Sequence, residues 1–240
     1  MIEKIFFLPY AGGSKYAYRN YIKLLPPQII AVTPELPGRG SRMDELPLDS
    51  LDELICSIYE QIKQETNCRY VIYGHSMGSL LGFLLTQKIV AANQNPPLFL
   101  CFTGCRAPST IAHGNRNVHL LGDEDFWKAI LAFGSLPVEV LEDQELRSMI
   151  EAPLRADFKV VETYRHIGRP VNSPVLVING ESENITDAEL NNWHVDATEK
   201  VVIKRFKGNH FFFLGQEHLV MAELFQFYDQ LNFANQCSGI

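Results

Sequence analysis

The chain has 240 residues, of which 46% are hydrophobic and 20% are charged, the balance of an ordinary globular protein that can bury a sizeable core. The formal net charge of −7 argues against broad binding to the phosphate backbone of nucleic acids. No apolar run approaches the roughly 18 residues of a membrane-spanning helix, and the four apolar residues before Pro9 are too few for a signal peptide.

Strand-like and helix-like patterns alternate along most of the chain, which predicts a mostly parallel sheet with crossover helices. In the first half, apolar runs predict strands over residues 5–9, 29–34, 69–74 and 98–104. Helices are expected between them, over residues 15–25, 50–65 and 76–92. The pattern is clearest over 50–65, because Ser50 and Glu53 can form a capping box ahead of a one-sided apolar stripe.

Residues 110–170 interrupt this alternation. They predict helices over 122–133, 142–150 and 153–167, with no strong strand between them. We interpret this stretch as a helical cap or lid inserted at one edge of the sheet. The alternation then resumes with strands over 175–180 and 200–206 and helices over 187–193 and 216–232. Since no repeat or low-complexity linker is present, we expect one domain over residues 1–240.

The stretch "YVIYGHSMGSL" (70–80) places Ser76 between Gly74 and Gly78, directly after a strand and before a helix. A G-x-S-x-G sequence in this setting is typical of the nucleophile elbow of α/β-hydrolases. The turn pushes the serine hydroxyl out above the sheet, and side chains in place of the glycines would collide with the adjacent strand and helix. Ser76 is therefore the candidate nucleophile, and Gly82 is expected to permit close helix packing one turn later.

A serine needs a base to accept its proton and an acid to orient that base, and in this fold the order along the chain is serine, acid, histidine. Of the seven histidines, His210 comes last but one, in "FKGNHFFFLG", just after the final strand and a glycine turn. A loop at that place can hang over the elbow. His75 lies within the elbow itself, and the remaining histidines suit surface, cap or helical positions. His210 is therefore the candidate base.

The acid should follow the strand over 175–180, where "NGESENITDAEL" offers several carboxylates. Thr186 and Glu189 form a T-x-x-E capping box, which places Asp187 at the first helical position, where it favours the helix dipole. Glu183 lies in the free part of the loop, three residues past Gly180. We favour Glu183 as the acid and keep Asp187 as the alternative.

Beyond these residues, motifs along nearly the whole chain resemble those of the type II, or editing, thioesterases that serve nonribosomal peptide and polyketide synthases. The motifs are "FLPYAGGS" (7–14), "ELPGRGSR" (35–42), "GHSMGSLLGF" (74–83), "TGCRAP" (103–108), "LPVEVLEDQEL" (136–146), "PLRADFKVVETY" (153–164) and "KGNHFFFL" (207–214). Two positions depart from the family pattern: Glu183 stands where the family usually has Asp, and Asn209 where it has Gly.

The resemblance implies an oxyanion hole made by the backbone N–H of Met77, directly after the nucleophile, and by that of Ala11, in the turn after the first strand. It also implies that the partner is an acyl or peptidyl carrier protein with an acyl-phosphopantetheine arm. Docking an acidic carrier would require a local basic or apolar patch on this acidic chain, for instance around Arg39 and Arg42 or on the cap. Three cap residues are either chamber lining or ordinary core: Phe126, Trp127 and Phe133.

Other functions share parts of this pattern. A carboxylesterase acting on small esters would use the same catalytic set without a carrier partner, and a carrier-binding regulatory module would retain the fold with weak activity. An acyltransferase would pass the acyl group to an acceptor other than water. We expect no cofactor, no bound metal and a monomer. The five cysteines, an odd number without a C-x-x-C pair, suit free thiols in a reducing compartment, so we expect a cytoplasmic protein.

Overall fold

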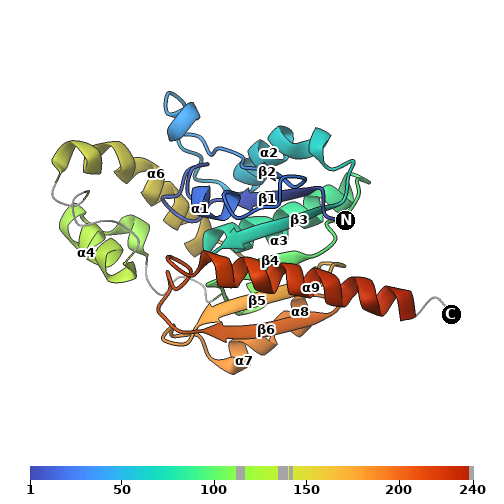
Figure 1. Cartoon of the computed structure of the whole chain (residues 1–240). Coiled ribbons are helices and arrows are strands. Elements are labelled where there is room, and N and C mark those ends of the chain that lie inside the picture. Colours follow the sequence, from blue (N-terminus) through green and yellow to red (C-terminus); the bar gives the residue numbers. More distant parts are fainter. Residues whose placement is uncertain (112–116, 135–139, 141–142, 238–240) are drawn as a thin grey trace.

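The computed structural model of the chain describes residues 1–111, 117–134, 140 and 143–237. Its centre is a six-stranded sheet in the order β2-β1-β3-β4-β5-β6, in which every pair of neighbouring strands is parallel (Figure 1). The strands are β1 Lys4–Leu8, β2 Ile30–Val32, β3 Tyr70–His75, β4 Leu100–Thr103, β5 Val175–Gly180 and β6 Val201–Phe206. The predicted α/β architecture is confirmed.

The central strands are continuous apolar runs because helices cover both faces of the sheet. All residues of β3, β4 and β5 are buried, whereas the edge strand β6 is half-buried throughout. One face is covered by α1 (Arg19–Ile22) and α9 (Glu217–Cys237), and the other by α2 (Leu51–Ile62) and α3 (Met77–Ala91) (Figure 1). Two hydrophobic clusters, one on each side, form the core.

Two short helices, α7 (Asp187–Asn191) and α8 (Trp193–Asp196), connect β5 to β6. The expected capping box is present, since the Thr186 side chain accepts from the backbone of Glu189 and the Glu189 side chain accepts from that of Thr186. A single helix over 187–193 was predicted, so the break between α7 and α8 is a correction. The expected helix over 15–25 is also shorter, since only α1 is helical there, and α9 continues beyond the predicted residue 232.

Helices α4 (Asp123–Phe133) and α6 (Gln144–Glu162) project together from one end of the sheet (Figure 1). They share a small hydrophobic cluster of their own, built on Phe126, Trp127, Ile130 and Leu154. The sequence predicted a break at Pro153, but α6 continues through it, and this prediction was wrong. A proline inside a helix costs about 3 kcal/mol, and here contacts on both sides of it, including Trp127 Nε1 to Glu151 at 3.2 Å, stabilise the continuous helix.

The sheet brings the carboxyl ends of β3, β5 and β6 to one edge. In open parallel sheets, ligands bind outside this edge. Ser76 directly follows β3, Glu183 follows β5, and His210 follows β6. Among the helices of the described ranges, none is long and apolar enough to cross a membrane.

Candidate active site

Ser76 occupies the turn between β3 and α3 with φ 53° and ψ −116°, a strained conformation for a residue with a side chain. The two flanking glycines make this turn possible. A Cβ on Gly74 would lie 2.2 Å from the Gly78 carbonyl oxygen, and one on Gly78 would lie 2.3 Å from the Leu8 carbonyl oxygen of β1. The collisions expected from the sequence, with the helix and with the adjacent strand, are both present. The turn therefore holds Ser76 above the sheet edge.

His210 lies between the other two candidate residues. Its Nε2 is 3.0 Å from Ser76 Oγ, and its Nδ1 is 2.6 Å from Glu183 Oε1. Because a carboxylate only accepts hydrogen bonds, the contact with Glu183 holds the proton on Nδ1. Nε2 is then left as the acceptor for the Ser76 hydroxyl. The three side chains form one hydrogen-bonded series. In the sequence, Glu183 lies 107 positions after Ser76, and His210 lies 27 positions after Glu183.

The Glu183 carboxylate is held on both of its oxygens. Oε1 accepts from His210, and Oε2 accepts from the backbone N–H of Gly180 at 2.6 Å. Its side chain is only 4% exposed. The glutamate side chain thus contacts both the start of its own loop, at Gly180, and the histidine.

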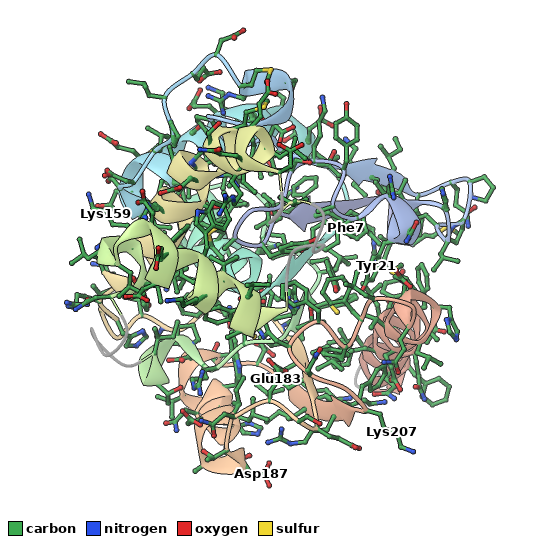
Figure 2. All side chains as sticks on the ribbon, turned by 90° about the vertical axis from the view of Figure 1, so that its left-hand side faces the viewer. Phe7, Tyr21, Lys159, Glu183, Asp187 and Lys207 are labelled. Atoms are coloured by element: carbon green, nitrogen blue, oxygen red, sulfur yellow. The ribbon has the colours of Figure 1, made fainter. Side chains whose placement is uncertain are left out.

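Asp187, the alternative acid, lies elsewhere. Its carboxylate is 2.7 Å from Arg205 Nη2 on β6, and its side chain is 85% exposed. Figure 2 shows Asp187 at the outer edge of the molecule, away from Glu183. Of the two acids considered from the sequence, the structure therefore brings Glu183 and not Asp187 to His210.

The loop that carries Glu183 is also held from β4. Arg106 Nε donates to Glu189 Oε1 at 2.7 Å, and Arg106 Nη2 donates to the carbonyl of Asn184. Burial alone would raise the pKa of Glu189, but hydrogen bonds from Thr186 and Arg106 outweigh it, so the pKa is lowered. This arginine belongs to "TGCRAP" (103–108), and it ties the end of β4 to the residue next to the candidate acid.

The three residues open into a pocket of about 600 Å³. Ser76 lines this pocket together with Met77, which directly follows it, and Ala11, the two residues predicted as oxyanion donors. The N-terminus of α3 begins at Met77, which adds the positive end of the helix dipole at this point. Part of the wall comes from the segment that the sequence indicated as a lid, through Ile111, Ala132, Phe133, Phe158 and Val161.

Comparison with known proteins identifies the family of this chain. Residues 3–230 match the model of the thioesterase domain family. The chain belongs to the thioesterase family. Among its relatives, the gramicidin S biosynthesis protein GrsT of Aneurinibacillus migulanus is 31% identical over 87% of this chain and 82% of its own length. The thioesterase PikA5 of Streptomyces venezuelae is 29% identical over 90% of this chain and 78% of its own.

Solved structures lead to the same family. The crystal structure of ClbQ from the colibactin NRPS/PKS pathway aligns with a TM-score of 0.88 at 28% identity, covering 98% of this chain and all of that one. The type II thioesterase BorB from the borrelidin biosynthetic cluster aligns with a TM-score of 0.85 at 27% identity, covering 94% and 92% of the two chains. The protein is therefore a serine hydrolase of the thioesterase type with an α/β-hydrolase fold.

In this thioesterase, His75 of the elbow is a buried structural residue. Its Nδ1 lies 3.0 Å from Thr103 Oγ1, and its ring lies 4.8 Å from that of His210, between centroids. Burial lowers the pKa of His75 well below the usual value for histidine, and the neighbouring His210 lowers it further. The His75 imidazole is therefore neutral and adds no positive charge next to His210, the candidate base.

Cys105 also lines the pocket, but it is a poor competitor for Ser76. Burial raises the pKa of its thiol to about 12, and burial raises the pKa of Cys101 as well. The thiolate is the nucleophilic form of cysteine, so neither residue supplies one at neutral pH. Within the described part of the chain, no group of His, Cys, Asp and Glu is arranged to hold a metal ion.

The three cap aromatics fall into two groups. Phe126 and Trp127 are buried in the cluster that joins α4 to α6, as ordinary core residues. Phe133 instead lines the pocket, with its ring 6.4 Å from the His210 ring. The sequence left open, for each of the three, whether it lines the pocket or belongs to the core. Of these three residues, only Phe133, in the last turn of α4, lines the pocket.

Arg39 and Arg42 do not form the free basic patch that the sequence suggested. The Arg39 side chain is 10% exposed and pairs with Asp157 of α6. Arg42 pairs with Glu45 at 2.5 Å and donates to the Glu35 carbonyl. Both guanidinium groups are engaged within the chain, so of the two places considered for a docking patch, this one does not offer free positive charges.

Sequence reasoning did not single out Asp157, although its signal was present. In "PLRADFKVVETY", Leu154, Asp157 and Val161 follow one another at helical spacing, so the aspartate lies on an apolar face. A carboxylate on such a face requires a buried partner. Asp157 is 1% exposed, and that partner is Arg39.

Proposed function

We propose that this thioesterase hydrolyses acyl thioesters carried on the phosphopantetheine arm of carrier proteins, and so unloads stalled or aberrant acyl groups during nonribosomal peptide or polyketide synthesis. The observation that carries the proposal is the series Ser76, His210 and Glu183 at the wall of a pocket of about 600 Å³. Relatives named for gramicidin S biosynthesis and for the colibactin and borrelidin pathways support the choice of substrate.

In the first half of the reaction, His210 Nε2 accepts the hydroxyl proton of Ser76 while Oγ attacks the thioester carbonyl carbon. Glu183 holds the imidazole through Nδ1–H and stabilises the imidazolium that forms. The tetrahedral intermediate then collapses. The carbon–sulfur bond breaks, the carrier thiol leaves with the proton from His210, and the acyl group remains on Ser76 as an ester.

The negative charge on the tetrahedral oxygen needs donors that are in place before the reaction. We assign this role to the backbone N–H groups of Met77 and Ala11, which lie with Ser76 on the pocket wall. Removing one such donor costs about 2.7–4 kcal/mol of transition-state stabilisation. The N-terminus of α3 adds its dipole in the same direction.

In the second half, His210 takes a proton from water, the resulting hydroxide attacks the acyl-serine, and the free acid leaves as Ser76 regains its proton. We assign residues 110–170 the role of a lid, since α4 and α6 supply part of the pocket wall. Movement of such a lid would admit the arm and exclude bulk water.

The test is the unloading of an acyl-phosphopantetheinyl carrier protein, followed by intact mass spectrometry. Wild type, Ser76→Ala and Asp187→Asn are compared at equal concentration. Wild type and Asp187→Asn are expected to remove the acyl group, and Ser76→Ala is expected to leave it in place. A wild-type protein that cleaves simple esters but leaves the carrier loaded would contradict the proposal and indicate a carboxylesterase. One that cleaves neither would indicate a binding module.

A further inference from the structure

Asp157 on α6 reaches from the lid helices into the body of the protein. Its carboxylate forms a two-point ion pair with Arg39, from Nη1 to Oδ2 at 2.6 Å and from Nη2 to Oδ1 at 2.7 Å. The same Oδ2 accepts the backbone N–H of Gly12 at 2.8 Å. One buried carboxylate therefore joins three separate segments: α6, the loop that contains Arg39, and the turn after β1.

That turn carries Ala11, which was assigned above as an oxyanion donor. Besides the contact of Gly12 with Asp157, Arg39 Nη1 donates to the carbonyl of Gly13 at 3.1 Å. The turn also packs directly against α6, since a Cβ on Gly12 would lie 3.1 Å from Leu154 Cδ1. Contacts to the two residues directly after Ala11 thus come from the ion pair and from the helix that holds it.

The ion pair has an electrostatic as well as a geometric consequence. A lone carboxylate hydrogen-bonded next to an oxyanion hole would oppose the negative charge that develops there during acyl transfer. Arg39 cancels that charge while holding both carboxylate oxygens. A two-point contact of this kind also fixes direction, which a single-point ammonium contact does not.

We propose that Asp157 and Arg39 are positioning residues that hold the oxyanion turn, the turn after β1 that carries Ala11, against α6. They also keep the surroundings of this turn electrically neutral. The position of the oxyanion hole is then fixed relative to α6. The inference rests on the proposed function, in that it takes Ala11 as a donor to the tetrahedral oxygen. Neither Arg39 nor Asp157 is among the residues that line the pocket.

The informative variant is Arg39→Met, which leaves the Asp157 carboxylate buried beside the turn without its counter-charge. We expect kcat/KM to fall about 100-fold, the size of losing one oxyanion donor, with KM changed less than about threefold. The double variant Arg39→Met/Asp157→Asn removes both charges but keeps an oxygen for the Gly12 N–H. We expect it to recover about tenfold relative to Arg39→Met.

Two further measurements separate positioning from loss of fold. Titration with a fluorophosphonate counts the functional Ser76 residues, so that kcat is expressed per folded site. The inhibition constant of an alkylboronic acid, whose Ser76 adduct places an oxygen in the oxyanion hole, is expected to rise in step with the loss of kcat/KM. If Arg39→Met does not fold, Arg39→Lys keeps the charge but not the two-point contact and is expected to lose about tenfold.

Asp49→Asn is the matched control. Asp49 pairs with Lys159, two residues after Asp157 on the same helix, but does not contact the turn. We expect its kcat and boronate inhibition constant to stay within about twofold of wild type, as for an exposed ion pair.

The inference would be overturned by an unchanged kcat per titrated site, by an unchanged boronate inhibition constant, or by a double variant that is worse than Arg39→Met. The series is run on an acyl thioester of free pantetheine as well as on the loaded carrier. A wild type that is active only on the small thioester would refute the carrier-protein function while the same series still tests the ion pair.

Discussion

The reaction centre and the lid helices are built in different ways. The reaction centre, Ser76, His210 and Glu183, lies at strand ends of a buried parallel sheet, and its acid is held by a backbone N–H as well as by the histidine. The lid helices, α4 and α6, share a small separate cluster. They are tied to each other by side-chain contacts: Trp127 Nε1 of α4 donates to Glu151 of α6 at 3.2 Å, and Arg155 Nη2 of α6 donates to Asp123 of α4 at 3.2 Å.

This difference indicates a division of roles. A strand end buried on both faces offers few alternative positions to a side chain, which suits groups that must keep reactive geometry within a fraction of an ångström. In the helix pair, side chains that face the pocket and not the body of the protein can change with little effect on the sheet. We therefore expect substitutions at the reaction centre to abolish chemistry, and substitutions of the residues of α4 and α6 that line the pocket to change the range of substrates.

The sharpest test of the reaction centre compares its two candidate acids. Glu183→Gln is expected to lower kcat by about 10³–10⁴-fold, because a neutral amide neither fixes the histidine tautomer nor stabilises the imidazolium. Asp187→Asn loses only an exposed ion pair with Arg205 and is expected to stay within about twofold of wild type. Steady-state hydrolysis of an acyl thioester measures both. Equal losses in the two variants would contradict the assignment of the acid.

The rigidity of the strand ends is tested by Gly78→Ala. The new Cβ would lie 2.3 Å from the Leu8 carbonyl oxygen, which is backbone and cannot rotate away. We expect the free energy of unfolding to fall by about 3 kcal/mol, as for severe overpacking. Gly122→Ala, at the start of α4 with nothing within 4 Å of the added Cβ, is the control and should change stability by less than about 1 kcal/mol. Urea denaturation measures the free energy of unfolding of both variants. Similar losses for Gly78→Ala and Gly122→Ala would contradict the expected difference between the strand ends and the start of α4.

His75 adds a pH dependence to the stability of the sheet. Its pKa is lowered in the folded protein by burial and by His210, so the unfolded chain takes up a proton that the folded chain does not. Stability should therefore fall with decreasing pH below about 6.5, by up to about 1.4 kcal/mol per pH unit from this residue. His75→Gln should lose that part of the slope, whatever its overall stability. Urea titrations between about pH 5 and pH 7.5 measure this, and parallel curves for the two proteins would refute it.

The smallest expected effect concerns the range of substrates. Phe133 lines the pocket, whereas Phe126 is buried in the lid cluster. Phe133→Ala should shift the ratio of kcat/KM for long over short acyl chains by about 10-fold, the worth of a few methylene groups in an apolar pocket. Phe126→Ala should instead lower stability by about 3–5 kcal/mol. Hydrolysis of a series of acyl thioesters of different chain length measures the first effect, and thermal unfolding measures the second. An unchanged chain-length profile for Phe133→Ala would contradict the division of roles.

Much of the fold was predictable because its signals are local. The strand runs, the Thr186 capping box and the glycines around Ser76 depend on residues close together in the sequence, and each is present as predicted. The predictions that failed depend on distant contacts. A break at Pro153 is the local expectation, and only the packing of α6 against the rest of the chain overrides it. Arg39 resembles a surface charge in the sequence, because its partner Asp157 lies 118 positions away.

The sequence by itself selected the candidate nucleophile and the candidate base, because the elbow needs glycines at fixed spacing and the histidine must follow the last strand. It also narrowed the acid to one loop. Only the tertiary structure decided between Glu183 and Asp187, since the choice depends on which carboxylate reaches a histidine that lies far along the chain. The same is true of Asp157 and Arg39, which are 118 positions apart. Hydrogen bonds and ion pairs act over a few ångströms, and folding alone brings such residues within that range.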